Sequence, residues 1–148
     1  MKFVLVFVIC FAIIGAATRE VKKQKQKTNC LDQTVRLISF VSNDLHYRKS
    51  DCDSLYEAAL LQGFSCIKAM NGELLPEGCY DDNVRSDFAV FLKSIGTTDT
   101  DGQLKLCEEY YQRMSDYLEA QRDVEKNKTQ VDFAVSLLGA FCVVVLFV

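Results

Sequence analysis

Both ends of this 148-residue chain are apolar, and all but one of its charges lie between them. Lys2 is followed by the apolar run 3–15, and residues 133–148 carry no charge at all. A chain that is apolar at both ends and hydrophilic between them is typical of a protein that enters the secretory pathway and stays tethered to a membrane. This pattern therefore constrains location more strongly than activity.

The first 17 residues are predicted to be a secretory signal peptide. They combine one positive charge, an apolar run and the small residues Gly15 and Ala17, which suit a cleavage site. The run is shorter than the roughly 20 apolar residues that a spanning helix needs. The alternative is a buried first helix. We expect the mature chain to begin near Thr18.

The apolar tail, residues 133–148, admits three interpretations. Its 16 residues would extend about 24 Å as a helix, less than the roughly 30 Å of a bilayer's hydrocarbon core. We favour a signal for GPI attachment at Asn127, with residues 127–132 as a short polar spacer. The alternatives are a short membrane-spanning segment and a helix packed in the protein's own core. Asn127 and Thr129 also form an N-glycosylation sequon, which competes for the same asparagine.

Between these ends we expect one small domain behind a basic leader. The leader, residues 18–29, holds five Lys or Arg and one Glu, and we expect it to be disordered. The domain, residues 30–126, holds 10 Lys or Arg and 18 Asp or Glu, an excess of eight negative charges. An acidic, exported domain is not expected to bind nucleic acid.

The domain is expected to be all-α, with about four helices around one core. The first helix would run over residues 29–47, and the second would start at Ser50 or Asp51 and end at Asn71 and Gly72. Residues 72–82 are expected to form a loop, and a third helix would open at Asn83. The fourth would begin at Thr100 with a capping box and shows the clearest 3.6-residue period.

Five cysteines remain in the domain once the apolar ends are set aside. In an oxidising compartment such cysteines usually pair and brace a small core. If the helices run up, down, up and down, Cys52 and Cys107 fall near one end, and Cys30, Cys66 and Cys79 near the other. We predict a Cys52–Cys107 bridge and a Cys30–Cys66 bridge, with Cys79 as the alternative partner.

One short segment resembles the calcium loop of an EF-hand. Thr97, Asp99 and Asp101 stand at ligand positions, Gly102 at the turn, and Glu108 where that family places its bidentate ligand. The resemblance implies a weak calcium site. It departs at the first position, where Thr97 replaces Asp. The interpretation that we prefer is a polar turn that leads into a helix and is capped by Thr100 or Asp101.

No other pattern indicates catalysis, a metal centre or a cofactor. A Ser or Cys nucleophile usually needs a nearby histidine, and the chain has only His46. We therefore expect a non-enzymatic binding or interaction protein, secreted or anchored at the cell surface, with an extracellular protein as its partner. The alternative is a secreted helical carrier of a small lipophilic ligand. Retention at the membrane favours the first class, because a carrier must leave to move its cargo.

Overall fold

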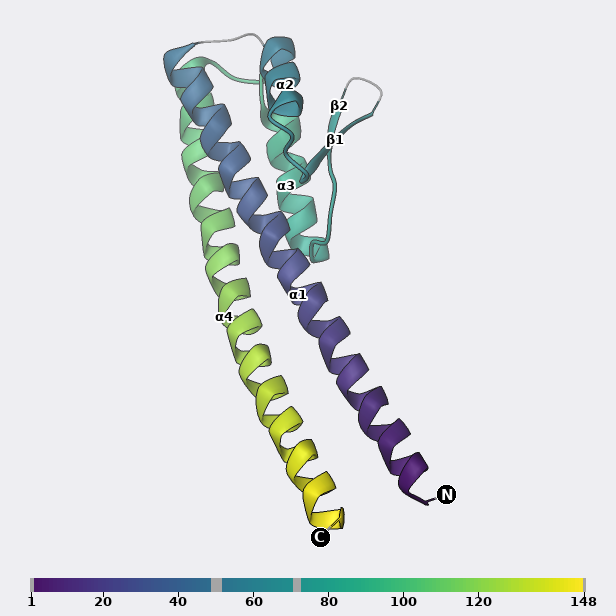
Figure 1. Ribbon diagram of the computed structural model, residues 1–148. Helices are drawn as coiled ribbons and strands as arrows, with labels where there is room; N and C mark the ends of the chain where they lie inside the picture. The colour runs from purple at the N-terminus through teal and green to yellow at the C-terminus, as the bar shows by residue number, and fades with distance from the viewer. Residues whose placement is uncertain (1, 49–51, 71–72, 148) are drawn as a thin grey trace.

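The computed structural model describes residues 2–48, 52–70 and 73–147. Within these residues, four helices and one two-stranded antiparallel hairpin follow one another (Figure 1). They are α1 (Lys2–Tyr47), α2 (Cys52–Leu61), β1 (Ile67–Met70), β2 (Glu73–Pro76), α3 (Asp82–Ser94) and α4 (Thr100–Phe147). The expectation of a mostly helical chain with four helices is confirmed. Two of the helices are much longer than expected.

The long helices α1 and α4 run antiparallel along the whole molecule, so that both termini lie at the same end (Figure 1). The shorter helices and the hairpin lie beside the other end. We call residues 31–118 the head, and we call residues 18–30 of α1 together with residues 119–139 of α4 the stalk. Of the residues whose burial the structure describes, those of the hydrophobic core all lie in the head.

The core forms where the apolar faces of all four helices meet beneath the hairpin. Its centre consists of Phe88 and Phe91 from α3 with Met114 from α4, none of which is exposed to solvent. Spacings of three and four residues place further apolar side chains on the same faces. The sequence pattern predicted most of this set, which includes Leu31, Ile38, Val41, Leu45, Leu55, Ala59, Val84, Leu92, Cys107, Tyr110 and Leu118.

The hairpin replaces the end of the predicted second helix and part of the predicted loop. Helix α2 ends at Leu61, and Gly63 then adopts the left-handed conformation with φ of +73°. Ile67 pairs with Pro76, and Met70 pairs with Glu73. Asn71 and Gly72, which we took as a helix stop, lie between the strands and outside the described residues. An Asn-Gly pair between two apolar runs is equally a hairpin signal, which explains the error.

The predicted helix start at Asn29 is also wrong, because residues 18–29 are helical as part of α1. The chain has no Gly or Pro between Gly15 and Gly63, so nothing in the sequence interrupts the helix there. Side chains of α4 also hold this segment in place. Gln24 Oε1 accepts a hydrogen bond from Gln121 Nε2 at 2.8 Å, and Thr28 Oγ1 donates one to Glu125 Oε2 at 2.6 Å.

The apolar tail continues α4 away from the core. Phe133, Leu137 and Leu138 are 72%, 65% and 64% exposed, which contradicts the hypothesis that these residues pack in the protein's own core. In the part of the chain that the structure describes, none of the helices is both long enough and apolar enough to cross a membrane.

Candidate functional site

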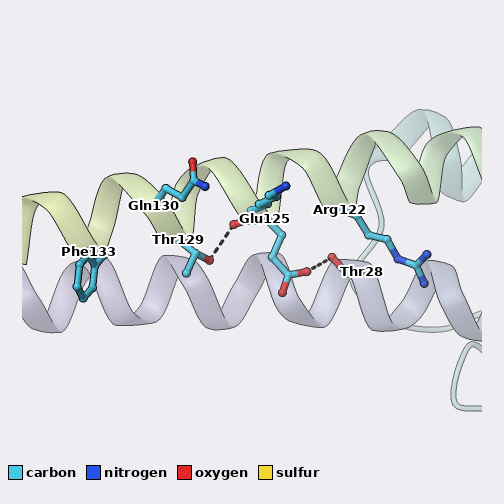
Figure 2. A pocket seen from close by; sticks show the side chains of 7 residues that line it. Thr28, Arg122, Glu125, Thr129, Gln130 and Phe133 are labelled. Carbon is cyan, nitrogen blue, oxygen red and sulfur yellow. Dashed lines mark hydrogen bonds between the residues drawn. The ribbon is translucent and has the colours of Figure 1, made fainter.

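A groove of about 760 Å³ lies between α1 and α4 in the stalk (Figure 2). Thr28 contributes from α1, and Glu125 and Thr129 face it from α4. Thr129 Oγ1 donates a hydrogen bond to the Glu125 backbone oxygen at 2.8 Å, and the Glu125 carboxylate accepts one from Thr28 Oγ1. The remaining walls are Arg122, Lys126, Gln130 and Phe133.

The groove offers contacts for binding and shows no catalytic arrangement. Its carboxylate is engaged by Thr28, and Arg122 donates to Asp32 Oδ1 at 3.1 Å. Glu125 and Arg122 each bond a residue of α1, so these two side chains join the helices. Phe133 forms an apolar wall at the end of the groove nearer the C-terminus, on the left in Figure 2. The groove therefore suits a polypeptide or a ligand with mixed polarity.

Three of the predicted disulfide cysteines lie close together where the head meets the stalk. The Cys79 amide donates to Cys30 Sγ at 3.4 Å. Gly78 makes this approach possible, because a Cβ there would lie only 2.6 Å from the same sulfur. Cys66 is fully buried beside Thr34 and Tyr80, near Cys30.

A partly buried polar cluster of Thr34 and Tyr80 lies beside Cys30 and Cys66. The Tyr80 hydroxyl lies 2.7 Å from Thr34 Oγ1 and donates to the Cys30 backbone oxygen at 3.3 Å. Burial raises the pKa of Cys66 to about 11 and also raises the pKa of Tyr80. Both groups are therefore protonated at neutral pH, and Cys66 is not a thiolate nucleophile. The four cysteines whose side chains the structure describes, Cys30, Cys66, Cys79 and Cys107, are free thiols.

Cys107 lines a second groove, of about 420 Å³, together with His46, Glu108 and Tyr111. No sequence motif connects Cys107 with the distant His46, and only the pairing of α1 with α4 brings them to one groove. Burial raises the pKa of Cys107 to about 11, so its thiol is not activated for catalysis. The side chain of Cys52, its predicted partner, is outside the part that the structure describes.

The segment that resembles a calcium loop is mostly helical. Asp99 Oδ1 accepts a hydrogen bond from the Gly102 amide at 3.1 Å and so caps α4. The cap is Asp99 and not Thr100 or Asp101 as we predicted. Glu108 lies in the third turn of α4, away from Thr97 and Asp101. Among the described residues, no group of three or more His, Cys, Asp or Glu is placed to hold a metal ion.

Asn127, the predicted anchor or glycan site, is exposed on α4 in the stalk. Its neighbour Lys128 donates to Glu20 Oε1 at 2.9 Å, so the site lies level with the start of the predicted mature chain. The side-chain amide of Asn127 is therefore accessible to solvent in the stalk.

Comparison with known proteins adds no relative to this description. No protein-family model, no curated protein and no solved structure matches the chain.

Proposed function

We propose that this chain is a non-enzymatic interaction protein of the secretory pathway, displayed on the cell surface by a lipid anchor at Asn127. The observation that supports it most is the position of the core. Among the residues whose burial the structure describes, the core residues lie between Leu31 and Leu118, inside the segment that remains after both predicted cleavages. Removal of residues 1–17 and 128–148 would leave that core intact.

The exposure of the tail supports the same proposal. Leaving a large apolar side chain in water instead of burying it forgoes roughly 1.5–3 kcal/mol. Phe133, Leu137 and Leu138 lie in this unfavourable position on one helix. Exchange of the tail for a lipid anchor removes the exposed apolar surface and keeps the head at the membrane.

The proposal includes disulfide bonds, which an exported domain is expected to form. The contact between Cys30 and Cys79 favours that pair over the Cys30–Cys66 bridge that we predicted from the sequence. Cys66 is less reactive because its burial suppresses the thiolate. The Cys52–Cys107 bridge stays a prediction.

The carrier function and the lipid anchor exclude each other in this geometry if cargo occupies the stalk groove. That groove uses Thr129, Gln130 and Phe133, all of which cleavage after Asn127 would remove. A carrier that uses it would have to keep its tail. The mature C-terminus therefore distinguishes the two functions.

The test is expression of the full chain in animal cells, followed by treatment with a phospholipase specific for phosphatidylinositol. We expect the enzyme to release the protein, with Asn127 as its last residue. Asn127→Gln should abolish release, because Gln is too large for an anchor site. Thr129→Ala is the matched control: it removes the glycan sequon but keeps a small residue, so release should persist. A surface protein that resists the enzyme and keeps its tail would refute the anchor.

A further inference from the structure

A small pocket of about 240 Å³ lies at the end of the head farthest from the termini. The last turns of α1 form most of its wall, and Gln62, which follows α2, forms the rest. Its walls are Phe40, Asn43, Asp44, Tyr47, Arg48 and Gln62. The volume corresponds to about eight water molecules, which suits a compact ligand.

Asp44 is the unusual residue of this pocket. It is only 5% exposed, and its Oδ2 has no hydrogen-bond partner. Among the described residues, Arg48 is paired with Asp44, but its Nη1 lies 3.9 Å from Oδ1, which is too long for a hydrogen bond, and its side chain is largely exposed. A buried carboxylate with an unpaired oxygen is strongly unfavourable unless a cation or a donor approaches it.

We propose that this pocket binds a small organic cation through an ammonium group, with Asp44 as the counter-charge. Aromatic faces and a carboxylate are the groups that recognise ammonium ions. Phe40 and Tyr47 line the pocket with Asp44, and Phe40 is supported by Phe64, at 5.9 Å between ring centroids. Asn43 and Gln62 add amide oxygens that accept N–H bonds.

The surroundings favour an ammonium group over a metal ion. Calcium takes six to eight oxygen ligands, usually including several carboxylates, whereas Asp44 is the only acid among the described residues that line this pocket. The excess of eight negative charges in residues 30–126 raises the local concentration of any cation. Arg48 is the internal competitor, because its guanidinium lies beside the same carboxylate.

The test is titration of the purified full chain with choline and with n-butylamine, followed by calorimetry. The neutral isostere of choline, 3,3-dimethylbutan-1-ol, is the reference ligand. We expect at least one ammonium probe to bind about tenfold or more tightly than the neutral isostere. Asp44→Asn should weaken that binding by about tenfold or more, and Arg48→Gln should strengthen it. Asp101→Asn, which makes the same charge change at an exposed position, should have no effect.

Two outcomes would overturn the proposal: neither ammonium probe binds, or Asp44→Asn binds them as the unchanged protein does. In either case the pocket holds water only. Should Asp44→Asn fail to fold, Tyr47→Ala decides, because Tyr47 is exposed and its loss should still weaken ammonium binding. Tyr111→Ala, another exposed tyrosine, is its control. None of these measurements depends on the lipid anchor, so failure here leaves that proposal untouched.

Discussion

The head and the stalk share two helices, yet different interactions stabilise them. In the head, α1 and α4 bury Leu37, Ile38 and Met114 against the short helices and the hairpin. In the stalk, the same helices meet through polar side chains, such as Gln24 with Gln121 and Thr28 with Glu125. The head therefore owes its stability to apolar burial, and the stalk to a few polar contacts.

This difference shows that helix length and helix stability are separate properties. A chain without Gly or Pro can continue as a helix well past its core, since nothing interrupts it. Without apolar burial, however, a pair of helices is only marginally stable in water. We expect the head to unfold cooperatively and the stalk to open locally at much lower free energy.

The largest predicted effect comes from removing a ring at the centre of the head. Phe88 is 0% exposed, so Phe88→Ala should lower the free energy of unfolding by about 3–5 kcal/mol. Leu137→Ala, in the exposed tail, should change it by less than about 0.5 kcal/mol. Urea denaturation of the full chain measures both. An equal loss from Leu137→Ala would show that the tail belongs to the core, and the division into head and stalk would fail.

Alkaline pH should destabilise the head. Burial raises the pKa of Cys66 and Cys107 from 9.0 to about 11, so the folded head holds these protons more tightly than the unfolded chain does. Each reduced thiol therefore makes its full contribution to the free energy of unfolding below pH 9, and this contribution is lost as the pH rises to about 11. The loss should be about 2–3 kcal/mol per thiol. Denaturation curves measured with a reductant at about pH 8 and about pH 11 test this. Cys66→Ala should remove its own share of the pH dependence, about 2–3 kcal/mol, and an unaltered dependence would contradict this.

The head was largely predictable from sequence because its apolar residues repeat with the period of a helix. Leu31, Ile38 and Val41 in α1 and Tyr110 and Met114 in α4 follow spacings that by themselves indicate a common core. The hairpin was missed because Asn71 and Gly72 suit a helix end as well as a strand turn. The stalk was missed because a run of lysines carries no periodic signal, and its contacts depend on residues far along the chain.

Much less of the site was predictable. The sequence singles out the cysteines and Asn127, which carry recognisable chemistry. It does not single out Asp44, which looks like an ordinary polar residue on the first helix. Asp44 and Gln62, next to the end of α2, line one pocket only because of the way α1 and α2 meet. The only signal in the sequence is that Asp44, an acidic residue, lies close to the apolar residues Val41 and Leu45 on the first helix.

Among the polar side chains of the stalk, we expect Gln24 to contribute most to its stability. Gln24 is 6% exposed and forms hydrogen bonds with both Glu20 and Gln121. Gln24→Ala leaves Gln121 without this partner and should cost about 0.5–1.5 kcal/mol. Because the stalk opens locally, the effect should appear as faster hydrogen exchange of stalk amides with little change in the head. Gln26→Ala, exposed on the same helix, should leave the exchange unchanged. Slower or equal exchange in Gln24→Ala would mean that another interaction joins the helices.

The smallest effect tests whether α1 and α4 keep their register near Asn127. The hydrogen bond from Lys128 holds the pKa of Glu20 below its ordinary value of 4.5, with further help from Gln24 and from the charge of Lys128. Lys128→Gln should therefore raise the pKa of Glu20, as measured by an NMR titration of its carboxyl group. Lys126→Gln removes the same charge from a side chain that is not bonded to Glu20, so it should shift that pKa less. If both variants leave the pKa of Glu20 unchanged, α1 and α4 are not in contact at Glu20 and Lys128, and in the stalk they meet only nearer the head, through Gln24 and Thr28.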